Sequence, residues 1–355
     1  MIKKTAKKLI RSFKDKSYHS AHKKSALKIL KSIESEKGIT DKKLIKLSDE
    51  YAQDVLGWKG YAPWLYVYSA MNNEFKEGWI PDNYYGKIVV PILKGKYGNI
   101  ANYNSLTSRL FNSSNFPDCV YFTNGFWISP EYHVLSDKEV IEIVTRSNEK
   151  VVHKIDDSSQ GNGVNIIERN SFHIEKVKLM GNGVIQKYIN QHKFFKDIIP
   201  HSVATLRITS VINEKGVVSV RACYLRVGRS SDTHVKSASQ IRIPINMSNG
   251  QLYKYGYTTN WLQIVKHPDT EYLFEDKMIP KFDKFIETAI NLHKMVPFTR
   301  TIGWDMILDV NESVQVMEWN GSHNDIRFSE ATQGPCFSDL GFEELWKNVK
   351  GIQSN

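Results

Sequence analysis

The stretch Gly303–Asn320, GWDMILDVNESVQVMEWN, has the pattern of a β-hairpin. Two apolar runs flank the turn-like segment 309–313. Asp305 stands at the start of the first strand, and Glu318 and Asn320 stand at the end of the second. Antiparallel pairing brings the start of one strand beside the end of the next. We therefore expect the three oxygen-bearing side chains at one end of the hairpin.

The side chains at this end of the hairpin have the chemistry of a metal site. Glu318 and Asn320 are two residues apart, so they share a face of the strand. Two carboxylates and an amide oxygen suit a hard cation such as Mg²⁺, whose other positions go to water and phosphate oxygens. The alternative is a strand end whose polar side chains only face solvent, and the rest of the chain has to decide between the two.

Length and composition point to a protein of two or three lobes. The chain has 355 residues, of which 41% are hydrophobic and 12% aromatic, enough for a sizeable core. Cys119, Cys223 and Cys336 are far apart, which argues against a disulfide framework or a zinc site and for a reducing compartment. No apolar run approaches the ~20 residues of a membrane span, and the N-terminus lacks a signal-peptide pattern. We expect a cytoplasmic protein.

The basic character of the chain is confined to its start. Residues 1–46 hold 15 Lys/Arg and 4 Asp/Glu, which accounts for the net charge of +10. Residues 2–14 repeat apolar positions at helical spacing, with basic residues between them. Such a helix can lie on an anionic membrane surface or bind a polyanion, and the alternative is a solvated helix packed on the protein. Nucleic-acid binding is not expected, because interleaved aromatic residues and a binding motif are missing.

Helices are expected for the next part of the chain as well. The pattern predicts a second helix at 20–36, ending near Gly38, and a third that begins at the N-cap Thr40 and stops at Gly57. The aromatic-rich segment 58–91 is typical of a packed helical cap, and a sugar-stacking platform is the alternative. A short strand is expected at 87–93.

A strand, a small-residue loop and a second strand follow in the middle of the chain. They are VVHK (151–154), DDSSQGNG (156–163) and VNIIERN (164–170). No helix follows the loop, so it is neither a P-loop nor a dinucleotide-binding motif. Such a loop can still lay backbone N–H groups over phosphates, and Lys154 would add a charge to them. The alternative is an ordinary hairpin turn. The elements expected before it are strands at 120–122 and 126–129 and a helix at 136–147 with a Ser136–Glu139 capping box.

The second half of the chain predicts an antiparallel sheet. VIQKYI (184–189) is one strand, and three longer alternating segments separated by turns follow between 203 and 257. Arg207, Arg226 and Arg229 lie on this sheet or at its ends. Arginines on strands are commonly exposed, but three of them on one sheet can clamp phosphate or carboxylate groups. The remaining elements expected are a helix at 280–295, a loop at 321–335 and a helix at 342–350.

The order of these elements resembles the ATP-grasp superfamily. The chain contains, in this order, Lys154 with its loop, an edge strand VIQKYI, an Arg-bearing sheet and the acidic hairpin. In the hairpin, an Asp is followed by a Glu thirteen residues on and then by an Asn, which is the superfamily's metal-binding spacing. More narrowly, residues 50–350 resemble the sugar-transfer-associated ATP-grasp proteins of capsule and exopolysaccharide genes. The segments that carry this resemblance are VIQKYINQHKFF…SVATLRITSV, YLRVGRS, APWLYVYSAMNNEFKEGWIPDNYY and HPDTEYLFEDKMIP.

This resemblance implies an α+β ATP-grasp fold, in which two α+β lobes grip ATP between antiparallel sheets, preceded by a helical basic N-terminal extension. The division that it implies is a basic helical region at 1–57, a cap at 58–118, a small lid subdomain at 119–189 and a large C-terminal subdomain at 190–355.

The resemblance also implies a role for each matching residue. ATP would be bound by Lys154, by Ser158, Ser159, Gln160, Gly161 and Gly163 of the loop, by Gln186, Tyr188 and Ile189 of the hinge, and by Arg109. Mg²⁺ would be bound by Asp305, Glu318 and Asn320. An acidic substrate would be bound by Arg226, Arg229 and Lys236. Lys154 and Arg207 would act in catalysis, with Arg207 neutralising the transferring phosphoryl group.

Three positions depart from the superfamily pattern. Arg109 is the best candidate for an earlier phosphate-binding Lys. Gly303 stands where an Arg often precedes the metal-binding Asp, which leaves that role to Arg207. HVKSASQ (234–240) replaces an Asp-Asn and Gly-Gly signature, so Lys236 would contact a different substrate.

The implied activity is an ATP-dependent carboxylate–amine ligase that works through an acyl phosphate. It would join an amino acid or amine to a sugar acid in surface polysaccharide synthesis, at the inner face of the membrane if residues 1–16 bind it. Two alternatives remain: a phosphotransferase that acts on a hydroxyl, and a non-catalytic membrane-surface scaffold in glycan assembly.

Overall fold

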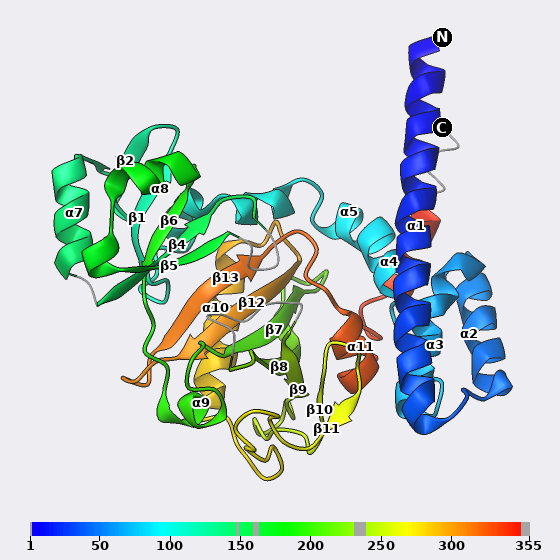
Figure 1. Ribbon diagram of the computed structural model, residues 1–355. Coiled ribbons are helices and arrows are strands. Elements are labelled where there is room, and N and C mark those ends of the chain that lie inside the picture. The colour runs from blue at the N-terminus through cyan, green and yellow to red at the C-terminus, as the bar shows by residue number, and fades with distance from the viewer. Residues whose placement is uncertain (1, 147–148, 159–162, 231–238, 349–355) are drawn as a thin grey trace. The chain divides into compact units, whose positions relative to one another are not determined.

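The computed structural model describes residues 2–146, 149–158, 163–230 and 239–348 (Figure 1). The chain forms two compact units. The first contains residues 1–95, 260–262 and 325–355, and the second contains residues 96–259 and 263–324.

The first unit begins with one long helix, α1 (Ile2–Lys37). The prediction of separate helices at 2–14 and 20–36 is wrong, because the residues between them include no Gly or Pro that would end a helix. The predicted end near Gly38 is confirmed, and this glycine has a φ of 89°. Among the described residues, no helix is long and apolar enough to cross a membrane.

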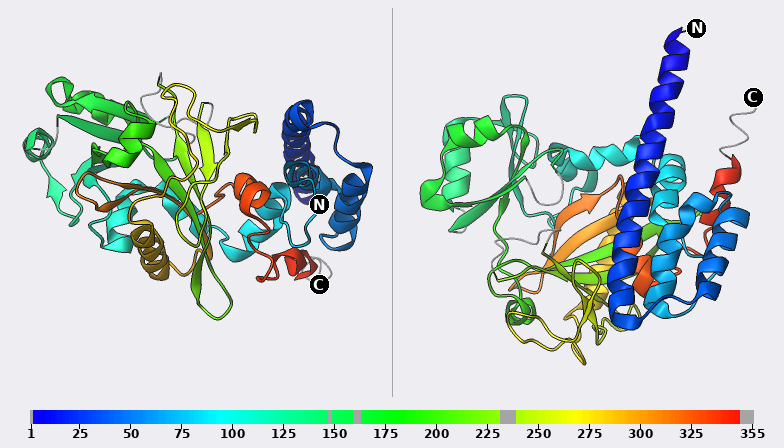
Figure 2. Two further views of the ribbon diagram at one scale, coloured as in Figure 1. Left: turned by 90° about the horizontal axis from the view of Figure 1, so that it is seen from below. Right: turned by 45° about the vertical axis from the view of Figure 1, so that its right-hand side comes forward.

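Helix α3 (Ala62–Asn72) is the centre of the first unit. It packs against α1, α2 (Lys42–Asp54) and α11 (Arg327–Gln333), and most of its residues are buried (Figure 2). The predicted loop at 321–335 is therefore partly wrong. Phe328 and Ala331 of α11 are buried, so packing against α3 stabilises this helix. The helix is too short for its own sequence pattern to predict it.

Helix α2 begins one residue later than predicted. The Asp41 carboxylate accepts a hydrogen bond from the Lys43 N–H at 2.8 Å, so Asp41 and not Thr40 is the N-cap. A carboxylate also interacts favourably with the positive end of the helix dipole, which Thr40 does not.

The aromatic segment 58–91 is confirmed as packed and helical. Beside α3 it forms η1 (Lys59–Tyr61), α4 (Asp82–Tyr84), the π-turn η2 (Tyr85–Val89) and α5 (Val90–Leu93). The predicted strand at 87–93 is wrong. Tyr85, Val89 and Leu93 are buried at a spacing of four residues, which is the period of a helix and not of a strand.

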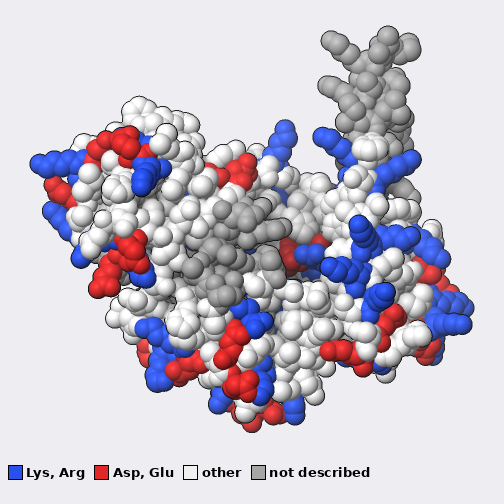
Figure 3. Space-filling model, in the orientation of Figure 1, with Lys and Arg blue, Asp and Glu red and all other residues white. Residues whose placement is uncertain are grey.

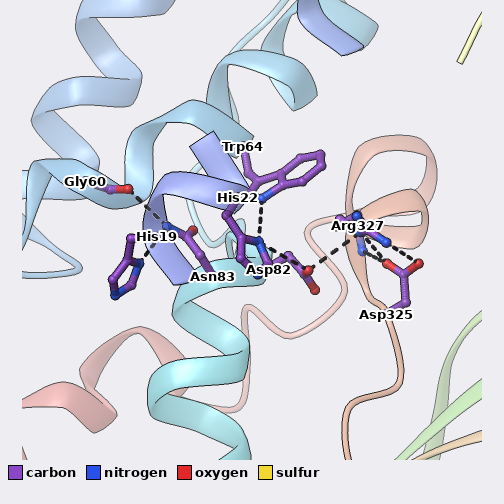
Figure 4. A network of polar contacts seen from close by, with 8 residues as sticks. All are labelled: His19, His22, Gly60, Trp64, Asp82, Asn83, Asp325 and Arg327. Carbon is purple, nitrogen blue, oxygen red and sulfur yellow. Dashed lines mark hydrogen bonds and ion pairs between the residues drawn. The ribbon is translucent and has the colours of Figure 1, made fainter. Parts of the chain in front are cut away.

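A polar network connects the helices of the first unit (Figure 4). The Trp64 Nε1–H donates to Nδ1 of His22 at 3.1 Å, and this nitrogen lies 3.7 Å from Oδ2 of Asp82. Arg327 contributes positive charge, since its Nε lies 3.6 Å from Asp82 and donates to Asp325 at 2.7 Å.

The second unit contains two antiparallel sheets (Figure 1). The smaller sheet has the strand order β3-β2-β1-β6-β4-β5. Its strands are β1 (Asp118–Thr123), β2 (Phe126–Ile128), β3 (Val134–Leu135), β4 (Lys150–Ile155), β5 (Val164–Glu168) and β6 (Gly183–Lys187). The expectation that VIQKYI is an edge strand is wrong, because β6 lies between β1 and β4 with four successive buried residues.

Two helices cover the smaller sheet. Helix α7 (Asp137–Arg146) has the predicted capping box: the Ser136 N–H donates to Glu139 Oε2 at 2.7 Å, and the Glu139 N–H donates to Ser136 Oγ at 3.4 Å. Helix α8 (Ile174–Met180) adds Val177 to the same apolar core.

The larger sheet has the strand order β11-β10-β9-β8-β7-β12-β13. Its strands are β7 (Thr205–Ile212), β8 (Val218–Val227), β9 (Ile241–Pro244), β10 (Gly256–Tyr257), β11 (Gln263–Ile264), β12 (Thr301–Leu308) and β13 (Val314–Asn320). Both the predicted antiparallel sheet and the predicted hairpin are confirmed. Helix α10 (Phe282–Met295) covers one face, where Leu206, Trp304 and Phe285 belong to one apolar core (Figure 2).

Short helical segments complete the described chain. In the second unit they are η3 (Tyr97–Asn102), η4 (Asn104–Leu106), α6 (Thr107–Phe111), η5 (Arg169–Ser171) and α9 (Lys193–Ile198). In the first unit η6 (Phe342–Glu344) is followed directly by helical residues 345–348, so the described part of the predicted helix at 342–350 is helical.

His153 of β4 is a buried histidine without a hydrogen bond. Its side chain has no exposed surface, and neither ring nitrogen has a partner among the described residues. Burial lowers its pKa to about 4. The buried His293 differs, because its ring nitrogens contact Ser210 Oγ at 2.6 Å and the Thr299 carbonyl oxygen at 2.8 Å.

We predict that His153→Leu reduces the loss of stability in mild acid. Between a pKa of about 4 in the folded chain and 6.5 in the unfolded chain, the unfolded state binds more protons, so stability falls as pH decreases. From pH 7 to pH 5, wild type should lose about 2 kcal/mol more than the variant in urea unfolding. His293→Leu is the control and should destabilise at both pH values. Equal losses in wild type and His153→Leu would contradict the prediction.

Candidate active site

The candidate site is a row of polar residues across neighbouring strands of the larger sheet. Arg207 of β7 lies opposite Asp305 of β12, which lies opposite Glu318 of β13. Directly opposed residues point to the same face of a sheet, and their Cβ atoms are about 5 Å apart. Leu206 and Trp304, the residues before Arg207 and Asp305, belong to the core under α10. The polar row therefore occupies the face of the sheet away from α10.

The Asp305 carboxylate is held by two arginines. Arg207 donates from Nε to Oδ1 at 2.6 Å and from Nη2 to Oδ2 at 2.9 Å, and Arg226 donates from Nη1 to Oδ2 at 2.9 Å. Burial alone would raise the pKa of Asp305, which is only 6% exposed, but the two guanidinium groups outweigh it and lower the pKa to about 2. Asp305 is therefore ionised at any physiological pH.

Glu318 differs from Asp305 in its surroundings. Its side chain is exposed to solvent, and no described residue donates a hydrogen bond to it. The protein around it and the opposed Asp305 carboxylate raise its pKa, while Lys154, Arg207 and Arg226 act in the other direction. Because Glu318 keeps contact with water, it is the one of the two acids that can exchange water for another ligand.

Asn320 completes the oxygen set at this end of the hairpin. It lies opposite Gly303, and its Nδ2 donates to the Gly303 carbonyl oxygen at 3.3 Å, which leaves its Oδ1 as an acceptor. Two carboxylates and this amide oxygen are ligands that Mg²⁺ accepts, with water and phosphate oxygens at the other positions. No three His, Cys, Asp or Glu residues form a metal cluster in the described ranges.

Lys154 brings the smaller sheet to the hairpin. Its Nζ donates to the Met317 carbonyl oxygen at 2.6 Å, immediately before Glu318. Burial lowers the pKa of Lys154, and the carboxylates of Glu318, Asp118 and Asp305 oppose that effect. Together with the two arginines at Asp305, it gives this face three cationic side chains against the two acids of the hairpin.

Asp118 is a site residue that the sequence analysis missed. It begins β1 opposite Gln186, whose Nε2 donates to Oδ1 of Asp118 at 2.7 Å. The Tyr121 hydroxyl donates to Oδ2, also at 2.7 Å. Burial raises the pKa of Asp118, and these two hydrogen bonds and Lys154 lower it. The sequence feature that points to Asp118 is an acid at the start of an otherwise apolar strand, but its partner Gln186 lies 68 residues away in the chain.

Comparison with known families decides which protein class this is. The model of the family described as sugar-transfer associated ATP-grasp matches residues 115–339, more than half of the chain. The chain belongs to this family. The predicted family, the predicted ATP-grasp fold and the expectation of an enzyme that uses ATP are thereby confirmed. No protein of curated function matches the chain.

Solved structures give only remote similarities. An ADP complex of N5-carboxyaminoimidazole ribonucleotide synthetase has 10% identity and a TM-score of 0.39, over 62% of this chain and 45% of that one. The biotin carboxylase domain of Hydrogenobacter thermophilus 2-oxoglutarate carboxylase has 11% identity and a TM-score of 0.41, over 69% and 44%. ATP-grasp ligase PsnB has 10% identity and a TM-score of 0.40, over 73% and 63%. The chain spans less than two thirds of each, and such likeness carries no information on its reaction.

The departure of this ATP-grasp chain at Gly303 has a steric explanation. A Cβ atom at residue 303 would lie 2.8 Å from Cβ of Asn324 and 3.6 Å from Cδ of Arg207. No side chain fits there without displacing Asn324. The guanidinium beside Asp305 therefore comes from Arg207 on the neighbouring strand.

Several sequence-predicted residues lie elsewhere or have other partners. Arg229 donates to both carboxylate oxygens of Asp269, at 2.9 and 2.6 Å, and lowers the pKa of that acid. Arg109 lies over the ring of Tyr132 at 5.2 Å, and no contact between described residues joins it to the acidic hairpin. The Ser158 hydroxyl donates to the Ile155 carbonyl oxygen at 2.7 Å.

The structure describes only some of the residues that were predicted to form the hinge and the loop. The Ile155 N–H donates to the carbonyl oxygen of Gly163, at the end of the small-residue loop. The Tyr188 ring lies 6.0 Å from Nζ of Lys150, and the Ile189 side chain is buried. Ser159, Gln160, Gly161 and Lys236 lie outside the described residues.

We predict that the two acids of the hairpin differ in their importance for stability. Asp305→Asn leaves the buried Arg207 and the partly buried Arg226 without their anion, so it should destabilise the fold by about 3–5 kcal/mol. Glu318→Gln changes an exposed side chain and should cost less than about 0.5 kcal/mol. Urea unfolding of both variants measures this, and similar losses would contradict the roles assigned to the two carboxylates.

Proposed function

We propose that the protein is an ATP-dependent ligase that joins a carboxylate to an amine through an acyl phosphate. The observation that carries this proposal is the row Arg207–Asp305–Glu318 with Lys154 beside it. These four residues place cations and Mg²⁺-type ligands on one face of the sheet. Such a surface suits a polyphosphate with a divalent cation better than it suits a neutral ligand.

The residues of the site divide between the nucleotide and the cation. Lys154 and the loop at 158–163 would bind the ATP phosphates, and Asp305, Glu318 and Asn320 would bind Mg²⁺. The cation would supply charge neutralisation between phosphate oxygens. Glu318 and the Asn320 amide oxygen accept no hydrogen bond from a described residue, so they are open to a ligand. Asp305 already accepts three, and its part would be to share the cation while holding the arginines in place.

The reaction follows from the electrophilicity of the acid substrate. A carboxylate resists attack by an amine until an oxygen of it displaces ADP from the γ-phosphorus and forms an acyl phosphate. The amine then attacks the carbonyl carbon, phosphate leaves and the nitrogen loses a proton, which gives an amide. Negative charge builds on the transferring group, and Arg207 and Arg226, which Asp305 holds in place, would neutralise it. The contribution of this chain is position and charge rather than covalent catalysis.

The acid substrate that we propose is a sugar acid of a surface polysaccharide, with an amino acid or amine as its partner. The family description, sugar-transfer associated ATP-grasp, supports a glycan context. A phosphotransferase acting on a hydroxyl would use the same nucleotide residues, and analysis of the product, an amide or a phosphate ester, separates the two. Arg226 contacts Asp305 of the candidate site, whereas Arg229 binds Asp269 away from it, so Arg226 is the better candidate for the acidic substrate.

We predict that nucleotide binding depends on Glu318. Isothermal calorimetry of wild type should give micromolar ATP binding that requires Mg²⁺. Glu318→Gln should weaken Mg²⁺-ATP binding about tenfold or more and abolish ATP-dependent turnover while the unfolding midpoint is kept. Glu312→Gln, in the turn of the same hairpin, is the matched control and should behave as wild type. ATP binding by Glu318→Gln equal to wild type would remove Glu318 from the site, and no binding by wild type would favour the scaffold alternative.

We also propose that residues 1–16 attach the enzyme to an anionic membrane surface at the inner face of the cell membrane. Phe13 is 75% exposed and Lys14 and Lys16 beside it are exposed, so this end of α1 offers an apolar and a cationic contact together. Further basic side chains lie over the described part of α1 (Figure 3). An apolar side chain that enters the interface and lysines that meet anionic headgroups reinforce each other.

The expected result is co-sedimentation with vesicles that contain anionic lipid and not with purely zwitterionic vesicles. Removal of residues 1–16, or Phe13→Ser with Lys14→Gln and Lys16→Gln, should abolish it, and 0.5 M salt should weaken it because surface charges are screened. Lys215→Gln, an exposed lysine of the second unit, is the control. Unchanged sedimentation of the truncated chain would exclude this attachment.

A further inference from the structure

Gln186 is held in one orientation by a carboxylate on the neighbouring strand. Asp118 and Gln186 are opposite each other in β1 and β6, and Gln186 is only 5% exposed. The Gln186 Nε2 donates to Oδ1 of Asp118, and the Tyr121 hydroxyl donates to Oδ2, each at 2.7 Å. Val152 pairs with Gln186 from the other side, so this amide lies in the interior of the smaller sheet.

The orientation of the amide follows from the chemistry of its partner. An ionised carboxylate only accepts hydrogen bonds, so Gln186 has to present its NH₂ group to Asp118. A glutamine amide without such a partner can turn by 180° at little cost, because its oxygen and nitrogen ends have similar size. Burial raises the pKa of Asp118, and the hydrogen bonds from Tyr121 and Gln186 and the charge of Lys154 oppose that rise. The Oε1 of Gln186 is thereby fixed as the end of the amide that faces away from Asp118.

We infer that Asp118 is a positioning residue that makes Gln186 select adenine over guanine. This inference rests on the proposed nucleotide site and on the expectation, from the family resemblance, that Gln186 of the hinge would face the base. The 6-amino group of adenine donates a hydrogen bond, and the fixed Oε1 accepts it. The 6-oxo group of guanine is an acceptor, so it would face Oε1 without a proton between them and leave two desolvated oxygens in contact.

The backbone beside Gln186 has the same preference. Ile189, three residues on, makes no hydrogen bond from its N–H to another described residue. An N–H suits N1 of adenine, which is an acceptor, and repels N1–H of guanine, which is a donor. The two groups therefore present an acceptor and a donor in the pattern complementary to adenine and opposite to guanine. A site that leaves buried polar groups unpaired with the wrong ligand discriminates strongly.

Measurement of ATP and GTP affinity in parallel tests the role of Asp118. Calorimetry with Mg²⁺ should show that wild type binds ATP at least about 100-fold more tightly than GTP. In Asp118→Asn the partner amide can donate or accept, so Gln186 can adopt either orientation. The ATP-to-GTP affinity ratio should then fall at least about tenfold, with ATP weakened and GTP strengthened. A role of Asp118 in folding alone would weaken both nucleotides together and leave the ratio unchanged.

Two further variants separate the effects. Tyr121→Phe removes the other hydrogen bond of Asp118 but keeps the bond to Gln186, so the ratio should stay near that of wild type. Asp118→Ser, whose hydroxyl donates or accepts, replaces Asp118→Asn if the latter does not fold, and the same fall in the ratio is expected. An unchanged ratio in a folded Asp118 variant that still binds ATP overturns the inference and leaves the proposed function intact. A wild type that binds neither nucleotide overturns both.

Discussion

The site depends on the contact of one carboxylate with two arginines. Asp305 and Glu318 face each other on adjacent strands, and two carboxylates in that position repel. Arg207 approaches Asp305 from the strand on the other side, and Arg226 joins it from the next. Because both guanidinium groups hold Asp305, its charge is compensated within the sheet. The exposed Glu318 is then the acid that remains open to a ligand.

The two sheets of the second unit supply different parts of this arrangement. The larger sheet carries the acidic hairpin and its arginines, and the smaller sheet brings Lys154 to the backbone of Met317. Both groups of residues lie on antiparallel strands, where register determines which side chains meet. A slip of one residue in β12 would place Asp305 on the side of α10 and Trp304 in the site. The buried Trp304 in the core under α10 therefore also maintains the chemistry on the opposite face.

Local pattern predicted much of this structure, and several of the errors come from contacts between distant segments. The hairpin at Asp305–Asn320 and the Ser136–Glu139 capping box depend on neighbours in the chain, and both are confirmed. The interior position of β6 could not be predicted, since it depends on β1 more than 60 residues earlier. Asp269, the partner of Arg229, lies 40 residues away in the chain, so the sequence around Arg229 does not predict this contact. A sequence period identifies a strand and its faces, but it does not identify the partner of a polar side chain.

The contrast between Glu318 and Glu330 separates a carboxylate that serves the fold from one that is open to a ligand. Glu330 in the first unit has no exposed surface, and its two oxygens accept the N–H groups of Ile80 and Cys336 at 2.8 Å each. Burial raises its pKa to about 7, and these bonds oppose the rise. Both of its oxygens are already bonded to the chain, so Glu330 joins distant segments of the first unit. Glu318 has equally little freedom of position on its strand, yet no described residue donates to it. A fold gains nothing from an acid placed opposite another acid and left unbonded, which supports the proposed role of Glu318 as a ligand of the cation.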